Sequence, residues 1–309
     1  DVNDLQISGP TAEVMNMEPI ADKFAAFGWN TVTIDGNDID AVLDAVSVAD
    51  GEKGRPTVVV ARTTKAKGIS FLEGTLGTTM AAETLTLIDP RKTFGQAVTD
   101  LAADDDRVVV LSADSGLSSG FGSFRERFPD RYYEFGIQEH GTTGVAAGLA
   151  STGKIPVFAA IAAFVTNRNY EAFRNDIAYM GQNVKIVGRN GGITYSDLGP
   201  THYSLEDYVI IRMLPGVVLS PQDPGEIREA AKAMIEHDGP VYMRIGGPSI
   251  PDLFPQAPFT IGEGRMIREG SRATVVTTGT ITPEVVVAVQ RLADDGIDVD
   301  LIGMPTVEP

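Results

Sequence analysis

Pro56-Thr57-Val58-Val59-Val60-Ala61 is a near-continuous apolar run with the length of one β-strand. Strands of this composition are typical of a parallel sheet that is buried on both faces. A shorter β-branched run at 31–34 precedes it, and a helical pattern with an acidic first turn at 38–49 lies between the two. The order strand–helix–strand predicts a right-handed crossover and therefore an α/β fold.

The same alternation resumes near residue 92 and runs towards the end of the chain. The preceding segment, 71–90, is small and turn-prone, which predicts a linker, and Met80 within it is either an ordinary linker methionine or the start of a second polypeptide. The Pro- and Gly-rich stretch 246–258 predicts a second connection. The helices expected after residue 91 are 92–102, 141–150, near 170–179, 224–236 and 283–294, and the expected strands are 107–111, 155–160, 184–187, 241–245, 273–278 and 298–302.

The composition excludes several classes of protein. The 309 residues contain no cysteine, so disulfides, thiolate nucleophiles and cysteine-ligated metal centres are absent. The net charge, 25 basic minus 42 acidic residues or −17, disfavours sequence-independent binding to nucleic acid. We find no apolar run near the ~20 residues that a bilayer needs, and no leader pattern, so we expect a cytoplasmic protein without a membrane partner.

One motif carries the strongest chemical signal, Phe135-Gly136-Ile137-Gln138-Glu139-His140-Gly141. Here a strand delivers a carboxylate to the start of a glycine-rich helix, at the strand end where open α/β sheets bind ligands. Glycines at such a point allow a tight turn and the close approach of a planar ligand. Taken alone, a Glu–His pair of this kind is more often a solvated acidic cap.

Two further segments support a site. Leu198-Gly199-Pro200-Thr201-His202 places a histidine on a loop, where the imidazole is suited to proton transfer or to binding an anionic substrate. The segment 111–119 ends a strand in Ser112-Ala113-Asp114 and a Gly/Ser loop. By itself this last segment is adequately explained as a helix cap and turn.

Taken together, these segments resemble transketolase over essentially the whole chain, and they are most similar to bacterial transketolases made of two separate polypeptides. The resemblance implies an α/β thiamine-diphosphate-binding fold, with parallel-sheet domains that carry helices on both faces. The family's G-D-G segment would lie before Asp1, so we expect a partial chain that lacks the front of the diphosphate-binding domain. The implied parts are the end of that domain at 1–75, a linker at 76–90, the pyrimidine-binding domain at 91–248 and the start of the C-terminal domain at 259–309.

The resemblance also implies roles for individual residues around the cofactor. Glu139 matches the glutamate that bonds the N1′ nitrogen of thiamine diphosphate, and Phe164 matches the aromatic side chain that stacks on the pyrimidine. Asp114 and Ile137 match positions close to the cofactor. His202 matches a catalytic histidine that contacts substrate near the reacting carbonyl or phosphate.

Substrate and metal positions follow from the same resemblance. Arg91, Ser118 and Arg244 match positions that bind the sugar phosphate, and arginines suit a phosphate dianion. The side chain of Asn3 and the carbonyl of Leu5 match ligands of Mg²⁺ or Ca²⁺, which prefer oxygen donors. One departure concerns substrate recognition. Asn190 stands where single-chain transketolases carry a substrate histidine.

The implied activity is transfer of a two-carbon ketol unit from a ketose phosphate to an aldose phosphate through the ylide of thiamine diphosphate, as in the pentose phosphate pathway. The family forms its site between subunits, so we expect a homodimer or a heteromer with a second transketolase chain. Two alternatives stay open. The chain could belong to a deoxyxylulose-phosphate synthase or a 2-oxo-acid dehydrogenase-type thiamine enzyme, or it could be an inactive fragment or subunit that needs a partner chain.

Overall fold

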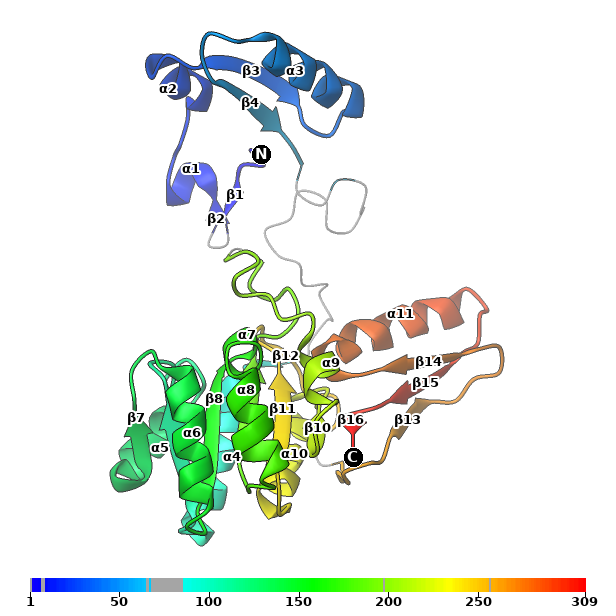
Figure 1. Cartoon of the computed structure of the whole chain (residues 1–309). Coiled ribbons are helices and arrows are strands. Elements are labelled where there is room, and N and C mark those ends of the chain that lie inside the picture. The colour runs from blue at the N-terminus through cyan, green and yellow to red at the C-terminus, as the bar shows by residue number, and fades with distance from the viewer. Residues whose placement is uncertain (1, 7–8, 65–66, 68–85, 197, 256) are drawn as a thin grey trace. The chain divides into compact units, whose positions relative to one another are not determined.

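The computed structural model of the chain describes residues 2–6, 9–64, 67, 86–196, 198–255 and 257–309 (Figure 1). The chain divides into two compact units, Asp1–Thr84 and Leu85–Pro309. Met80 and positions 76–85 of the predicted linker lie outside the described residues. The described end of that linker forms strand β5 (Leu87–Ile88), and helix α4 (Pro90–Asp104) begins directly after it.

The first unit contains a two-stranded parallel sheet. Strands β3 (Asn30–Asp35) and β4 (Thr57–Arg62) pair in register, and α3 (Ile39–Gly51) connects them, as predicted. The Asp38 carboxylate caps α3 by accepting the backbone N–H groups of Asp40 and Ala41. The remaining elements of this unit are β1 (Leu5–Gln6), β2 (Gly9–Pro10), α1 (Thr11–Val14) and α2 (Ile20–Ala26).

Burial in this unit is lower than the apolar run at 56–61 predicts. Within the described part of the unit, the buried apolar side chains are Ala45 and Val60, whereas Ile39, Leu43 and Val46 on α3 are exposed. The sheet has two described strands, and every β4 residue except Val60 is only partly buried. The expectation that this strand is buried on both faces is therefore wrong for the described residues.

The second unit is built on a seven-stranded sheet in the order β16-β10-β11-β9-β8-β6-β7 (Figure 1). Every adjacent pair is parallel except β10 with β16, which is antiparallel. The strands are β6 (Val108–Ser112), β7 (Tyr132–Glu134), β8 (Ile155–Ile161), β9 (Lys185–Arg189), β10 (Val217–Leu219), β11 (Val241–Ile245) and β16 (Thr306–Glu308).

Helices cover both faces of this sheet, as predicted. Val108 and Val110 of β6 pack with α4, α5 (Gly122–Arg127) and α10 (Pro224–Glu236) in one buried cluster. Val109 and Leu111 point the opposite way, because side chains alternate along a strand, and pack in a second cluster. The helices of that second face are α6 (Glu139–Ala150), α7 (Ala162–Val165), α8 (Tyr170–Ala172), which continues into η2 (Phe173–Tyr179), and α9 (Asp207–Ile211).

The end of the chain forms a smaller sheet in the order β13-β15-β14. Helix α11 (Thr282–Asp294) links the parallel strands β14 (Thr274–Thr277) and β15 (Asp300–Gly303), and the chain then returns as β16 to the edge of the large sheet. The other short elements are η1 (Pro129–Arg131), β12 (Ile250–Pro251), which pairs with β5, β13 (Arg265–Arg268) and η3 (Gly279–Ile281). Among the helices of the described residues, none is long and apolar enough to cross a membrane.

Candidate active site

Glu139 lies at the first position of α6, just after the carboxyl end of β7. Gly136 in the connecting turn has φ +70°, a backbone conformation that favours glycine. The Glu139 residue is only 4% exposed, and the Arg168 guanidinium satisfies its carboxylate, with 2.6 Å between Nη1 and Oε2. The motif thus presents a buried carboxylate that is held by one cation.

A chain of aromatic rings begins at the same arginine, Arg168. Phe164, on the short helix α7 after β8, is half-buried, and the Arg168 guanidinium carbon lies 4.4 Å from its ring centroid. The His202 ring is 5.2 Å from the Phe164 ring, and the Tyr195 ring is 6.1 Å from that of His202. The structure therefore brings Glu139, Phe164 and His202 into one contiguous group through Arg168, a residue that the sequence analysis did not identify.

A second buried arginine organises the predicted phosphate positions. Arg189, at the end of β9, is 3% exposed and donates to Ser118 Oγ at 2.8 Å, to Ser119 Oγ at 3.1 Å and to the Tyr195 hydroxyl at 2.7 Å. Burial lowers the pKa of Arg189, and the charge of Arg91 nearby adds to that effect, against a raising contribution from Tyr195. Arg189 and Arg91 are thus two cations that lie close to the same Tyr195 hydroxyl.

Arg91 itself is paired with Asp89, with 2.8 Å between Nη2 and Oδ2. The hydrogen bonds that Arg91 donates to this carboxylate raise the pKa of Arg91, and Tyr195 contributes in the same direction. The turn that carries Ser118 packs against α4 so closely that a Cβ at Gly95 would overlap the carbonyl of Gly120. This close approach places Ser118 and Arg91 beside the same Tyr195–Arg189 pair.

Arg189 carried only a weak signal in the sequence. A charged residue that ends an apolar strand and precedes a Gly-Gly turn is more often a solvated strand end than a binding residue. The structure makes it a buried residue because β9 is a central strand of the sheet and the 111–119 loop folds over its end.

Arg244 points to the other side of the sheet. It shares a strand face with Tyr242, which packs in the second cluster, whereas Arg189 shares a face with Val187 in the first. Its guanidinium carbon is 4.4 Å from the Tyr208 ring centroid, and its Nη1 is 3.4 Å from the fully buried Oδ1 of Asp207.

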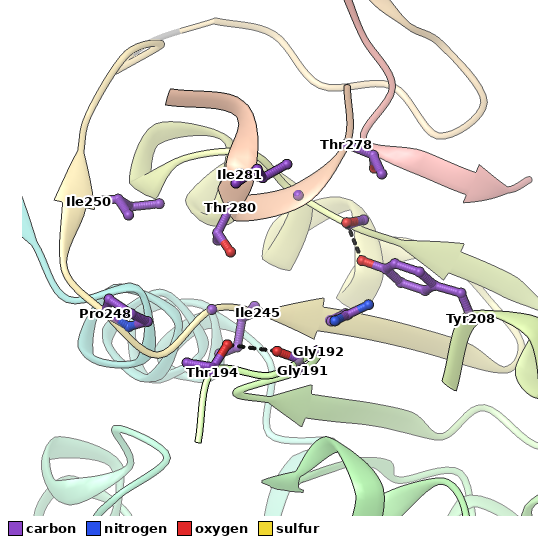
Figure 2. Close-up of a pocket in the computed structure, with 14 residues that line it drawn as sticks. Gly191, Gly192, Thr194, Tyr208, Ile245, Pro248, Ile250, Thr278, Thr280 and Ile281 are labelled. Atoms are coloured by element: carbon purple, nitrogen blue, oxygen red, sulfur yellow. Dashed lines mark hydrogen bonds between the residues drawn. The ribbon is translucent and has the colours of Figure 1, made fainter. Parts of the chain in front are cut away.

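The cavity that Arg244 lines has a volume of about 380 Å³ (Figure 2). Gly191 and Gly192 form one wall and Thr278, Thr280 and Ile281 of the C-terminal segment form another, while the Tyr208 hydroxyl bonds Ser220. Burial raises the pKa of Asp207, whereas Arg244 and Tyr242 lower it, so the charge of this carboxyl group depends on those two partners. The structure thus gathers Arg91 and Ser118 around Arg189 and places Arg244 in a cavity of its own.

The remaining predicted positions lie at turns. Asp114 is exposed with φ +55°, and its backbone N–H donates to Glu134 Oε1 at 2.7 Å. Ile137 is 78% exposed. In the first unit, Asn3 Oδ1 accepts the N–H of Leu5 at 3.1 Å. In the part of the chain that the structure describes, there is no group of three His, Asp or Glu side chains that could hold a metal ion.

Comparison with known proteins identifies the family. Residues 87–250 match the transketolase pyrimidine binding domain, residues 1–97 the transketolase thiamine diphosphate binding domain and residues 262–309 the transketolase C-terminal domain. The chain belongs to the transketolase family of thiamine-diphosphate enzymes. A solved transketolase from Campylobacter jejuni shares the fold, with a TM-score of 0.65 at 19% identity over 99% of this chain and 61% of that one.

More similar relatives belong to transketolases made of separate chains. The 6-deoxy-6-sulfo-D-fructose transketolase subunit SqwH of a Clostridium species is 37% identical, over 71% of this chain and 69% of its own length. An apulose-4-phosphate transketolase subunit of Phocaeicola vulgatus is 31% identical over 72% of each chain. A solved structure described as a split gene transketolase, inactive beta4 tetramer, has a TM-score of 0.66 at 34% identity, covering 72% of this chain and 73% of that one. The predicted similarity to split transketolases is confirmed.

Proposed function

We propose that this chain, which includes the pyrimidine-binding domain, belongs to a transketolase that transfers a two-carbon ketol unit from a ketose phosphate to an aldose phosphate. The observation that carries the proposal is the buried Glu139 carboxylate and the half-buried Phe164 ring, which both contact Arg168 at the carboxyl edge of a parallel sheet. A buried acid next to an exposed part of an aromatic face suits a planar, nitrogen-containing ring.

The residues present suit thiamine diphosphate. Glu139 would hold a proton shared with the pyrimidine ring, and Phe164 would stack on that ring, with Asp114 and Ile137 at the rim of the site. When bound, thiamine diphosphate supplies the carbanion chemistry that carries the two-carbon unit, while the protein orients the reactants. Asn3 Oδ1 and the Leu5 carbonyl are oxygen donors, which Mg²⁺ and Ca²⁺ prefer, so we assign them to the metal of the diphosphate group.

His202 is the candidate for proton transfer at the substrate. Its Nδ1 lies 2.9 Å from the Thr201 hydroxyl, and its ring contacts Phe164, so two neighbours restrict its orientation. An imidazole can both donate and accept a proton in one catalytic cycle. We therefore expect His202 to move a proton at the sugar rather than to bind the cofactor.

The basic groups indicate a substrate with an anionic end. Arg189 and Arg91 surround Ser118 and Tyr195, and a phosphate would find hydroxyl and guanidinium donors there. The resemblance assigns Arg244 to the sugar phosphate as well, but its guanidinium lines a separate cavity on the other side of the sheet, so we place Arg189, Arg91 and Ser118 at one anionic group and Arg244 at another part of the sugar phosphate. Two relatives are named for a sulfonated and a phosphorylated sugar, so an anionic terminus is common to both of those names.

A second candidate function is 1-deoxy-D-xylulose-5-phosphate synthase. An enzyme of that name from Geobacter sulfurreducens is 37% identical over 70% of this chain, although the match spans only 35% of the enzyme. The test is product identity. With thiamine diphosphate and Mg²⁺, xylulose 5-phosphate plus ribose 5-phosphate should give a seven-carbon ketose phosphate, whereas consumption of pyruvate with glyceraldehyde 3-phosphate would refute the transketolase assignment.

We also propose that the active protein is a homodimer or an assembly with a second transketolase chain. The names of the relatives, which describe them as subunits, support this proposal. The assay is therefore run on this chain alone and after addition of a purified diphosphate-domain chain of a split transketolase. Full activity of this chain alone, in a preparation shown by light scattering to be monomeric, would contradict the need for a partner.

A further inference from the structure

The Arg168 guanidinium makes two contacts at once. Its Nη1 is 2.6 Å from Glu139 Oε2, and its guanidinium carbon is 4.4 Å from the centroid of the Phe164 ring. A guanidinium is flat, cationic and rich in N–H donors, so it can stack on an aromatic ring and pair with a carboxylate at the same time. These are the two contacts that the proposed function assigns to the aminopyrimidine ring of the cofactor.

Hydrogen bonds hold both neighbours of Arg168 in place, whereas the Arg168 side chain itself is half exposed. The buried Asn169 side chain donates to the Glu139 carbonyl at 3.1 Å and to Thr143 Oγ1 at 2.7 Å, which ties this turn to the start of α6. On the other side, Asn167 bonds the Glu206 carboxylate. The Arg168 side chain is 47% exposed, so it can leave its partners for solvent while the backbone stays in place.

The Glu139 carboxylate, unlike the Arg168 guanidinium, is too buried to lose its partner to solvent. Its side chain is 5% exposed, and an ionised buried carboxylate without a partner is costly. In the protein without cofactor, Arg168 provides that partner. A bound ring with its own donor could take over the pairing, and the guanidinium would then swing out to water.

We propose that Arg168 is a placeholder for the aminopyrimidine ring, and that cofactor binding requires its displacement from Glu139 and Phe164. The inference rests on the proposed thiamine-diphosphate site. The displacement lowers the apparent affinity for the cofactor, because only the fraction of molecules with Arg168 out of the site is competent to bind. The placeholder also keeps the buried acid paired before the cofactor arrives.

The proposal predicts the direction in which the affinity for thiamine diphosphate changes when Arg168 is replaced. Arg168→Ala removes the competitor and leaves Glu139 unpaired in the cofactor-free protein, so the dissociation constant for thiamine diphosphate should fall by about tenfold. The melting temperature of the cofactor-free protein should fall, and saturating cofactor should restore most of that loss. Arg168→Lys keeps the charge but cannot stack as a flat fork, so its dissociation constant should lie between those of wild type and Arg168→Ala.

The experiment is calorimetric titration of thiamine diphosphate, with Mg²⁺, into the full chain in the assembly that it forms. Arg174→Ala serves as the matched control, since Arg174 is an exposed arginine that donates to the neighbouring Asn175. Its affinity for the cofactor should equal that of wild type. Glu139→Gln and Phe164→Ala test the site itself and should both weaken binding.

The outcomes separate the two proposals. If Glu139→Gln and Phe164→Ala weaken binding while Arg168→Ala leaves it unchanged or weakens it, the cofactor site stands and the placeholder is refuted. If neither Glu139→Gln nor Phe164→Ala alters binding, or if wild type binds no cofactor in its assembly, the proposed site fails and the placeholder fails with it. Tighter binding by Arg168→Ala together with a less stable cofactor-free protein supports the placeholder.

Discussion

Replacing Arg189 by methionine should separate anion recognition from the rest of the reaction. Arg189 is nearly fully buried and donates hydrogen bonds to Ser118, Ser119, Tyr195 and Asn190. Methionine keeps most of the apolar stem and removes the charge and every donor. If Arg189 contacts the terminal phosphate of the sugar, the variant loses a charge-assisted interaction in a desolvated site.

The size of the effect follows from the kind of contact. Truncating one partner of a buried, hydrogen-bonded charge pair costs ~2–5 kcal/mol. A loss of ~3 kcal/mol corresponds to a decrease in kcat/KM of roughly 150-fold, at ~1.4 kcal/mol per factor of ten. Arg189→Lys keeps the charge but loses the planar set of guanidinium donors, so its kcat/KM should lie between those of wild type and Arg189→Met.

The assay compares two donors that differ only in the anionic group, xylulose 5-phosphate and xylulose, with glycolaldehyde as a neutral acceptor. We expect the large loss of kcat/KM for the phosphorylated donor and a change of only a few-fold for the neutral one. Arg212→Met is a matched control, because Arg212 is an exposed arginine paired with Glu308. Equal losses for both donors, in a variant that retains its circular dichroism spectrum, would show that Arg189 acts through structure and would refute the reasoning.

Three further predictions concern stability. Burial lowers the pKa of Lys185 to about 7 from its ordinary 10.5. Between these two pH values the unfolded chain binds more protons than the folded chain, so the free energy of unfolding should rise with pH. Denaturant melts at pH 7 and pH 9 should show a rise of about 2 kcal/mol in wild type but not in Lys185→Met. Gly95→Ala should destabilise the protein by ~1–3 kcal/mol, because the added Cβ would overlap the backbone of Gly120. Gly148→Ala should stabilise it by up to ~1 kcal/mol, because this helical position has open space for a Cβ. Urea titrations in which both variants change the free energy of unfolding in the same direction would be inconsistent with the packing described. Tyr242→Phe deletes the hydroxyl that donates to the buried Asp207 at 2.8 Å, and should lower the free energy of unfolding by ~1.5–3 kcal/mol. Tyr203→Phe removes a more exposed hydroxyl and should lower it far less. Thermal melts that show equal losses for the two variants would argue against a buried carboxylate that depends on Tyr242.

Local sequence determined most of the α/β framework. The apolar run at 107–111 became β6, the pattern at 224–236 became α10, and the Gly-Ile-Gln-Glu motif delivered Glu139 to a helix start, as predicted. These features depend on near neighbours, because strand alternation, helix caps and turn glycines act over a few residues. Short strands such as β10 and β16 were missed, since three residues carry too little pattern and their pairing partner is distant in the chain.

The chemistry of the site was only partly determined by sequence. Motifs and their resemblance to transketolase indicated Glu139, Phe164 and His202, but no local pattern indicated that Arg168 would pair with Glu139 across 29 positions or that Arg189 would reach Ser118 across 71. Which side of a sheet an arginine faces depends on strand register, and this separates Arg244 from Arg189. Tertiary structure decided which charges meet, because burial and pairing depend on which strands lie side by side and which loops close over their ends.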